Sequence, residues 1–148
     1  MSPWFEQNPE RIAALIVEAS TWMGTPFFPN SSSKHRGASC HKLVGAIYDA
    51  VGFGTYDVPD VPMNTTLFRA TDVVEKYLGA RPEFVRVEDA PRVGDLLGFR
   101  IGKSVHHLGI LIGPGVFIHA IPPPGVVPGY LSDATWAGRL AITWRPSA

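Results

Sequence analysis

The chain has 148 residues, enough for one domain with one sizeable core, and we expect a single domain over residues 1–148. Hydrophobic residues make up 45% and charged residues 18%, a composition that excludes a disordered chain. The 13 basic residues equal the 13 acidic ones and no basic run occurs, so we expect no nucleic-acid partner.

Three helices are predicted in the first half of the chain. The first spans residues 8–23, with Asn8 as its cap and Pro9 in its first turn. A loop over 24–39 leads to a second helix that begins after Ser39 and stops at Gly52. Its apolar residues form one stripe: Cys40, Leu43, Val44, Ile47, Tyr48 and Val51. A third helix is expected over about 65–78, with Asn64 or Thr65 as cap, Leu67, Ala70, Val74 and Leu78 on its apolar side, and Gly79 as its end.

The second half of the chain reads as short strands separated by turn residues. They are expected at about 84–87, 95–101, 105–112, 115–120 and 139–145. Residues 121–129, IPPPGVVPG, are too proline-rich for an interior strand and are predicted to be a loop. Helices first and antiparallel strands second indicate an α+β fold, with the N-terminal helices packed on a sheet of about five strands. No apolar stretch approaches the roughly 20 residues of a spanning helix, so no membrane span is expected.

The one cysteine excludes an internal disulfide and is a candidate nucleophile. Cys40 falls in the first turn of the second helix, where the helix dipole favours a thiolate and free amides could receive an oxyanion. An imidazolium nearby would lower the thiol pKa further. The alternative is that Cys40 is simply a buried core residue, as free cysteines often are.

The five histidines decide between these two interpretations. His35 lies in a polar loop, and His41 is about 100° round the helix from Cys40, so it is expected to point away. On the strand that follows, His107 shares a face with Gly109, which leaves room beside an imidazole, and we therefore prefer His107 to His106 as the base. His119, on the next strand, could accept a hydrogen bond from the His107 ring and fix its tautomer.

A zinc site made of the cysteine and two histidines is a further alternative. The close ligand pairs that such sites use, CxxC or HxxxH, are absent, and no carboxylate is well placed. We therefore expect no metal ligands.

Four sequence elements, in this order, resemble the NlpC-type cysteine peptidases, which are papain-like cell-wall hydrolases. They are Gly37-Ala38-Ser39-Cys40, the stretch from Pro91 to Leu97 with Gly94-Asp95-Leu96, His107-Leu108-Gly109-Ile110, and Phe117-Ile118-His119-Ala120. The resemblance covers roughly residues 10–120. It implies a papain-like fold, with Cys40 as nucleophile, His107 as base and His119 as the third polar residue.

Three departures from the family pattern surround Cys40, and they make the residues concerned candidates for the substrate cleft. Ser39 stands in place of Asp, and His41 and Lys42 replace small residues, which could make the rim of the cleft more cationic. Phe27 replaces a tyrosine in Gly24-Thr25-Pro26-Phe27. His106 completes this set of cleft candidates. Pro29 and the later Lys34-x-x-Gly37 look most like members from phages and prophages.

The resemblance implies hydrolysis of an amide bond in a peptidoglycan stem peptide, with the D-glutamyl–diamino acid bond as one candidate and no cofactor. An acyltransferase or amidase on the same site stays open, as does a degenerate wall-binding or structural module of a phage tail or secretion particle. No secretory signal is seen, so we expect synthesis in the cytoplasm, followed by association with a virion or release to the cell wall. A phage-tail or targeting protein is the expected partner.

Overall fold

The computed structural model describes residues 1–62 and 65–148. Its helices are α1 (Trp4–Gln7), α2 (Glu10–Trp22), α3 (Cys40–Ala50), α4 (Thr65–Ala70), α5 (Val73–Gly79) and α6 (Ala134–Arg139). Its strands are β1 (Ser32–Ser33), β2 (Gly37–Ala38), β3 (Phe84–Val87), β4 (Leu96–Ile101), β5 (Ser104–Gly113), β6 (Val116–Ile121), β7 (Gly125–Tyr130) and β8 (Leu140–Pro146).

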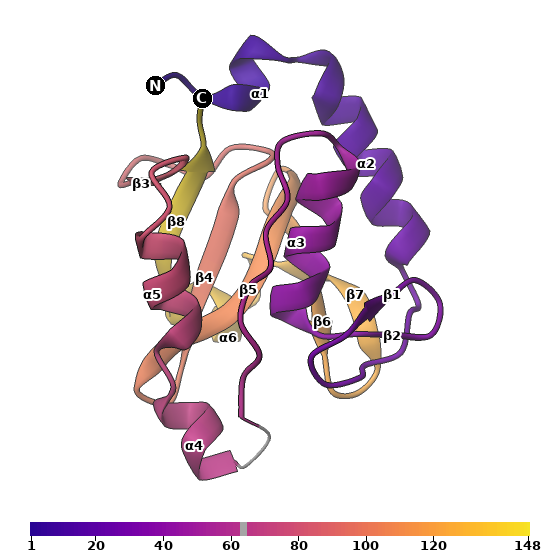
Figure 1. Cartoon of the computed structure of the whole chain (residues 1–148), viewed down its shortest axis with the longest axis vertical. Helices are drawn as coiled ribbons and strands as arrows, with labels where there is room; N and C mark the ends of the chain where they lie inside the picture. Colours follow the sequence, from indigo (N-terminus) through magenta and orange to yellow (C-terminus); the bar gives the residue numbers. More distant parts are fainter. Residues whose placement is uncertain (63–64) are drawn as a thin grey trace.

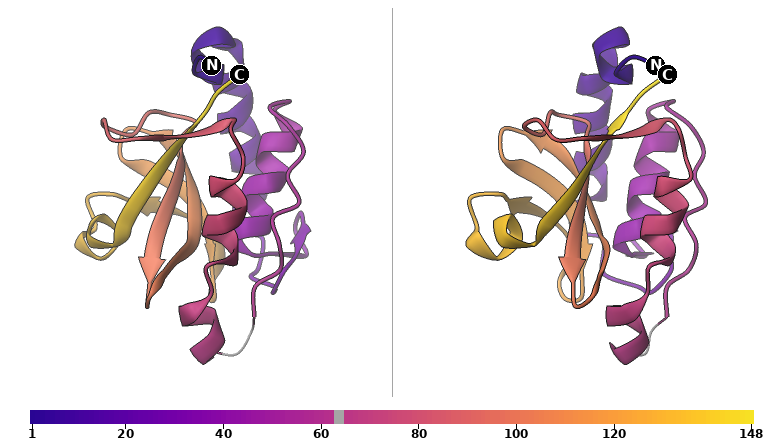
Figure 2. Two further views of the ribbon diagram at one scale, coloured as in Figure 1. Left: turned by 60° about the vertical axis from the view of Figure 1, so that its left-hand side comes forward. Right: turned by 90° about the vertical axis from the view of Figure 1, so that its left-hand side faces the viewer.

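A six-stranded antiparallel sheet in the order β3-β8-β4-β5-β6-β7 forms the centre of the molecule. Helices α2, α3 and α5 cover one face, and α6 lies on the other (Figure 1; Figure 2). The larger core cluster joins the helices to the sheet, with Leu43 and Ile47 of α3 and Leu108 and Ile110 of β5 among its members. The expected α+β fold is confirmed, with six strands in the sheet in place of about five.

The predicted strands agree closely with the observed ones. The first predicted helix begins two residues later than expected, after the unpredicted short helix α1, and the third predicted helix is divided into two. The first helix begins at Glu10, because Asn8 turns its side-chain amide back to the carbonyl of Trp4 and ends the short helix α1. The region 65–78 breaks between α4 and α5, where Thr71 Oγ accepts the backbone N–H of Val73. Leu67, expected on the apolar side of the predicted helix, is 58% exposed. Asn64 lies outside the described residues.

The prediction of a loop over 121–129 is wrong for its second half, which forms β7. This strand lies at the edge of the sheet and pairs with β6. Pro128 has no N–H to donate, and an edge strand tolerates that because its outer side needs no partner. The prolines therefore exclude residues 125–130 from an interior strand of the sheet but not from an edge strand. The short elements β1, β2 and α6 were also not predicted.

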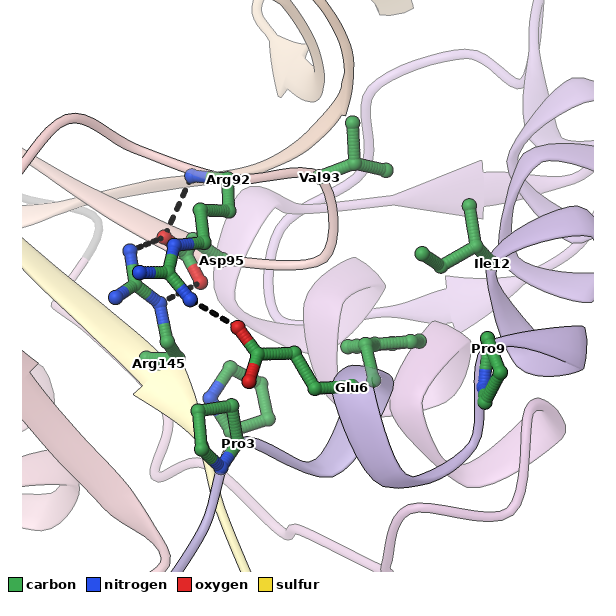
Figure 3. A pocket seen from close by; sticks show the side chains of 10 residues that line it. Pro3, Glu6, Pro9, Ile12, Arg92, Val93, Asp95 and Arg145 are labelled. Carbon is green, nitrogen blue, oxygen red and sulfur yellow. Dashed lines mark hydrogen bonds and ion pairs between the residues drawn. The ribbon is translucent and has the colours of Figure 1, made fainter.

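A buried ion pair anchors the turn before β4 to the last strand. Asp95 Oδ1 and Oδ2 accept from Arg145 Nε and Nη2 at 3.1 and 2.9 Å, and Oδ2 also accepts from the backbone N–H of Arg92 (Figure 3). Arg145 also reaches both carboxylate oxygens of Asp89. A cavity of about 310 Å³ lies beside this network, with Glu6 paired to Arg92 at its rim. The termini meet close by, where Ser2 and Ala148 exchange backbone hydrogen bonds.

We predict that Asp95→Ala lowers the free energy of unfolding by about 3–5 kcal/mol, because it leaves the Arg145 guanidinium buried without its inner partner. Urea denaturation followed by circular dichroism measures the change. Asp57→Ala is the matched control: that carboxylate also faces a cation, Lys42, but its side chain is 97% exposed. The control should lose no more than about 1 kcal/mol. Equal losses in the two variants would contradict the structural role of Asp95.

Candidate active site

Cys40 is the first residue of α3, and its sulfur lies against the backbone of β5. The thiol is 3.7 Å from the carbonyl oxygen of His106, to which it donates, and the N–H of Leu108 also reaches the sulfur. The Cys40 side chain is therefore held beside the two peptide groups that flank His107. The side chain is buried, with 6% of the residue exposed.

Ser39 occupies the N-cap position in an extended conformation, but its hydroxyl does not cap the helix. Ser39 Oγ instead accepts from the backbone N–H of Ser31 at 3.3 Å. The first amides of α3 are thereby left without a side-chain acceptor, and those of Cys40 and His41 point to the sulfur and lower its pKa. Amides in this position could also stabilise an oxyanion on a carbonyl attacked by that sulfur.

The expectation of a lowered thiol pKa is wrong for this structure. Burial raises the pKa of Cys40 to about 11, and the hydrogen bonds from the amides of Leu108, His41 and Cys40 only partly oppose it. Desolvation disfavours the charged form of any buried acid, and here it outweighs the helix N-terminus. The resting site therefore holds a neutral thiol at neutral pH rather than a thiolate–imidazolium pair.

His107 and His119 form a hydrogen-bonded pair on neighbouring strands of the sheet. His107 Nε2 lies 2.9 Å from His119 Nδ1, and both residues are buried. Burial is the main cause that holds the pKa of His107 well below its ordinary value, and the neighbouring His119 is the second cause. Burial also lowers the pKa of His119, to about 4. Both rings are thus neutral near pH 7. If His107 donates through Nε2, its Nδ1 is left as the basic nitrogen.

An aromatic cluster surrounds the two histidines on the face of the sheet that carries α6. The Trp136 ring stacks on the His107 ring, with centroids 5.0 Å apart and an interplanar angle of 26°, and meets His119 edge-on at 4.9 Å. Phe99 and Phe117 pack against the other sides of the imidazoles. This cluster fixes the ring planes and removes water from them, which accounts for the low imidazole pKa values.

Two glycines provide the space that these rings occupy. A Cβ at Gly109 would come within 2.9 Å of the Ile118 carbonyl oxygen, so this position has no room for a side chain between β5 and β6. A Cβ at Gly129 of β7 would lie 2.9 Å from His119 Nε2 and would strike the Phe117 ring. The room expected at Gly109 is therefore filled by Phe117, His119 and the backbone of β6, and Gly129 of the unpredicted strand β7 is a second such close approach.

A cavity of about 350 Å³ lies where α3 begins and where β4 and β6 end. Cys40 and His107 both line it, whereas His119 lies behind His107 and is not among the described lining residues. Of the predicted cleft residues, Phe27, Ser39 and His41 line the cavity. The remaining lining residues are Pro29, Asn30, Val61, Ile101, Ala120, Ile121, Pro122 and Trp136.

His41, which was expected to point away from Cys40, is buried and lines the same cavity. It is 1% exposed, and its Nε2 lies 2.9 Å from Asn30 Oδ1. The orientation of the Asn30 amide is set by Val61, whose N–H donates to Oδ1 and whose carbonyl accepts from Nδ2. Since Oδ1 can only accept, His41 is the donor through Nε2, and burial lowers its pKa to about 4.

Lys42 and His106 are not among the described residues that line the cavity. Lys42 Nζ donates to the Val58 carbonyl at 2.6 Å and pairs with Asp60 at 2.9 Å and Asp57 at 3.4 Å. The expected contribution of Lys42 to a cationic rim is therefore offset by two carboxylates. The His106 ring lies on the opposite face of β5 from His107, where its Nε2 donates to the Ile101 carbonyl at 3.2 Å. His35 is exposed, as expected.

Sequence reasoning missed Trp136, Asn30 and Val61. The only local signal was Asp133, which caps α6 by accepting from the Thr135 N–H at 2.9 Å and so marks a helix start ahead of Trp136. Asn30 adopts a left-handed conformation with a φ of 49°, but nothing in its neighbours indicates its contacts with His41 and Val61. In the part of the chain that the structure describes, no three His, Cys, Asp or Glu residues could hold a metal ion together. Nor does any described helix have the length and apolar character needed to cross a membrane.

Similarity to known proteins covers most of the chain. Over 48 residues, 32% of this chain and 26% of the relative, it is 40% identical to the murein DD-endopeptidase MepS/murein LD-carboxypeptidase of Escherichia coli strain K12. Over 128 residues, 85% of this chain and 69% of the relative, it is 29% identical to a Haemophilus influenzae protein named "Probable endopeptidase". The match to the Escherichia coli enzyme thus spans about a quarter of that enzyme's length.

Solved structures show the same fold. The NlpC/p60 domain of the peptidoglycan hydrolase SagA aligns with a TM-score of 0.58 at 23% identity, covering 90% of this chain and 97% of that domain. The sequence profile of the NlpC/P60 family matches residues 28–145. This chain belongs to the NlpC/P60 family.

Proposed function

We propose that this protein is a cysteine hydrolase that cleaves an amide bond in the stem peptides of bacterial peptidoglycan. The observation that carries the proposal is the meeting of Cys40 and His107 in one cavity, with His119 2.9 Å behind His107. The similarity to a murein DD-endopeptidase and to a probable endopeptidase supports the choice of substrate. The D-glutamyl–diamino acid bond is one candidate. Delivery to the wall as part of a phage tail, or through a targeting protein, belongs to the same proposal.

The reaction would start from the neutral pair. When a carbonyl carbon approaches Cys40 Sγ, the thiol proton passes to His107 and the S–C bond forms, with the amides at the start of α3 next to the new oxyanion. The C–N bond then breaks, and His107 returns its proton to the leaving amine. Water, deprotonated by His107, hydrolyses the thioester and restores the thiol. His119 acts as a positioning residue by holding the His107 tautomer.

We predict that Cys40→Ser and His107→Ala each reduce the release of peptides from purified peptidoglycan at least about 1,000-fold, because each removes a group that forms or breaks bonds. Chromatography of the soluble products, with detection by mass, measures the rate and identifies the bond. His35→Asn is the matched control, since His35 is an exposed histidine with a φ of 69° that asparagine also adopts.

Folding of each variant is checked by its urea denaturation midpoint. If folded Cys40→Ser and His107→Ala retained wild-type rates, the cysteine-hydrolase assignment would be wrong. If the wild type bound peptidoglycan and released no peptide, the protein would be assigned as a non-catalytic wall-binding module instead of a hydrolase.

The acid limb of kcat/KM should lie below pH 6.5, the ordinary histidine value. His107 can act as a base only in its neutral form. Burial holds its pKa well below that value, so activity should persist as the pH is lowered until the pH approaches the pKa of His107. In His119→Ala, which removes the second cause of that shift, the acid limb should move to higher pH. Initial rates between pH 4.5 and 8 measure both profiles.

Stability has to be followed in the same pH series. His41 and His119, with pKa values of about 4 when folded, take up protons in the unfolded chain near pH 6.5 but not in the folded one. Folding stability therefore falls as the pH drops from 6.5 towards 4, and circular dichroism at each pH separates unfolding from titration of the base. An acid limb at or above pH 6.5 in folded protein would contradict the assignment of a buried, neutral His107.

A further inference from the structure

The walls of the cavity that holds Cys40 are uncharged. Its described lining residues include no Asp, Glu, Lys or Arg, and eight of them are apolar: Phe27, Pro29, Val61, Ile101, Ala120, Ile121, Pro122 and Trp136. Ser39, the residue before the candidate nucleophile, is neutral, and its hydroxyl oxygen accepts the backbone N–H of Ser31. A charged group of a substrate would therefore find no oppositely charged side chain among these residues, and the first amides of α3 are directed to the Cys40 sulfur.

The polar residues of the lining are also held neutral. His41 donates to Asn30, whose amide is in turn held by the backbone of Val61, so this chain of hydrogen bonds is satisfied within the wall. Burial keeps the pKa of His41 at about 4 and that of His107 well below its ordinary value. Neither ring supplies a cation near pH 7.

The charged side chains of Lys42 and Arg139 do not line the cavity. Lys42 follows His41 in the first turn of α3 but turns outward to Asp57, Asp60 and the Val58 carbonyl. Arg139 at the end of α6 acts on His107 only through its field, because it is exposed and does not line the cavity. The segment 57–61 is thus tied to α3 at two adjacent residues, Lys42 and, through Asn30, His41. These hydrogen bonds and ion pairs hold the segment so that Val61, which is apolar, lines the cavity.

An unpaired charge moved from water into an apolar, partly closed site loses hydration that nothing replaces, whereas a neutral amide of the same size loses much less. We propose that this cleft selects substrates whose acyl segment, next to the scissile carbonyl, is uncharged. The inference rests on the proposed cysteine-hydrolase function and narrows its substrate class. Within stem peptides, it favours a glutamyl residue whose α-carboxylate is amidated over one that carries the free carboxylate.

The test compares two alkylating reagents of nearly equal size that differ in charge. Iodoacetamide is neutral and iodoacetate is an anion, and both modify the same sulfur. The second-order rate constant for iodoacetamide is divided by that for iodoacetate, for Cys40 at pH 8. This ratio, divided by the same ratio for N-acetylcysteine, is the normalised ratio, and it isolates the effect of the cavity. Mass spectrometry follows the modification of the intact chain, in which Cys40 is the one cysteine. We expect the normalised ratio to favour iodoacetamide at least 10-fold.

Ile101, at the end of β4, is the position for a matched pair of variants, because it lines the cavity and is only half-buried. Ile101→Lys places a cation in the wall and should lower the normalised ratio at least 5-fold. Ile101→Met introduces an uncharged side chain similar in length to that of lysine and should leave the normalised ratio within 2-fold of the wild-type value.

A wild-type ratio at or below that of N-acetylcysteine would overturn the inference while leaving Cys40 a reactive nucleophile. A ratio that Ile101→Lys does not change would also overturn it, because the discrimination would then not arise in this cavity. Failure of both reagents to modify folded Cys40 even at pH 10, where about a tenth of a thiol with a pKa of about 11 is ionised, while urea-unfolded protein reacts, would show that solutes do not reach the sulfur. That outcome would reject the proposed function itself, and with it the inference.

Discussion

The burial of the first turn of α3 against β5 is the constraint on which the site depends. It brings Cys40 Sγ to 3.7 Å from the His106 carbonyl and beside the Leu108 amide, so the sulfur lies next to the strand that carries His107. Leu43, Val44 and Ile47 continue the same apolar stripe into the main core. The hydrophobic effect that packs this helix therefore also sets the position of the candidate nucleophile.

The same burial determines the electrostatic state of the site. A helix N-terminus beside an imidazole is an arrangement that usually lowers a thiol pKa, but desolvation here raises it, and both histidines are kept neutral. Such a site can still react, because transfer of the thiol proton to neutral His107 accompanies formation of the S–C bond, and the resulting negative charge lies on the carbonyl oxygen beside the first amides of α3. It differs from a preformed ion pair in that charge develops only when a substrate is bound.

Residues that depart from the family pattern have structural roles in this chain. His41 and Lys42 stand in place of small residues and secure the segment 57–61, one through Asn30 and Val61, the other through Val58 and two aspartates. Lys42 is thereby directed away from the cavity, whereas His41 lines it with its ring held by Asn30. Asn30 and Val61 line the cavity beside Cys40 and His107, so the bonds from His41 shape one of its walls.

The sequence by itself determined the order and type of most elements and the placement of Cys40 in the first turn of an amphipathic helix. It also determined that His107 and Gly109 share one face of a strand. These features follow from periodicities and turn residues within a few positions of one another, which act locally. Only the tertiary structure decided that residues 125–130 form an edge strand and that Trp136 stacks on His107. It also decided that Asn30 holds His41 and that burial raises the thiol pKa. Each of these depends on segments far apart in the chain, and desolvation exists only once those segments have closed around the side chain.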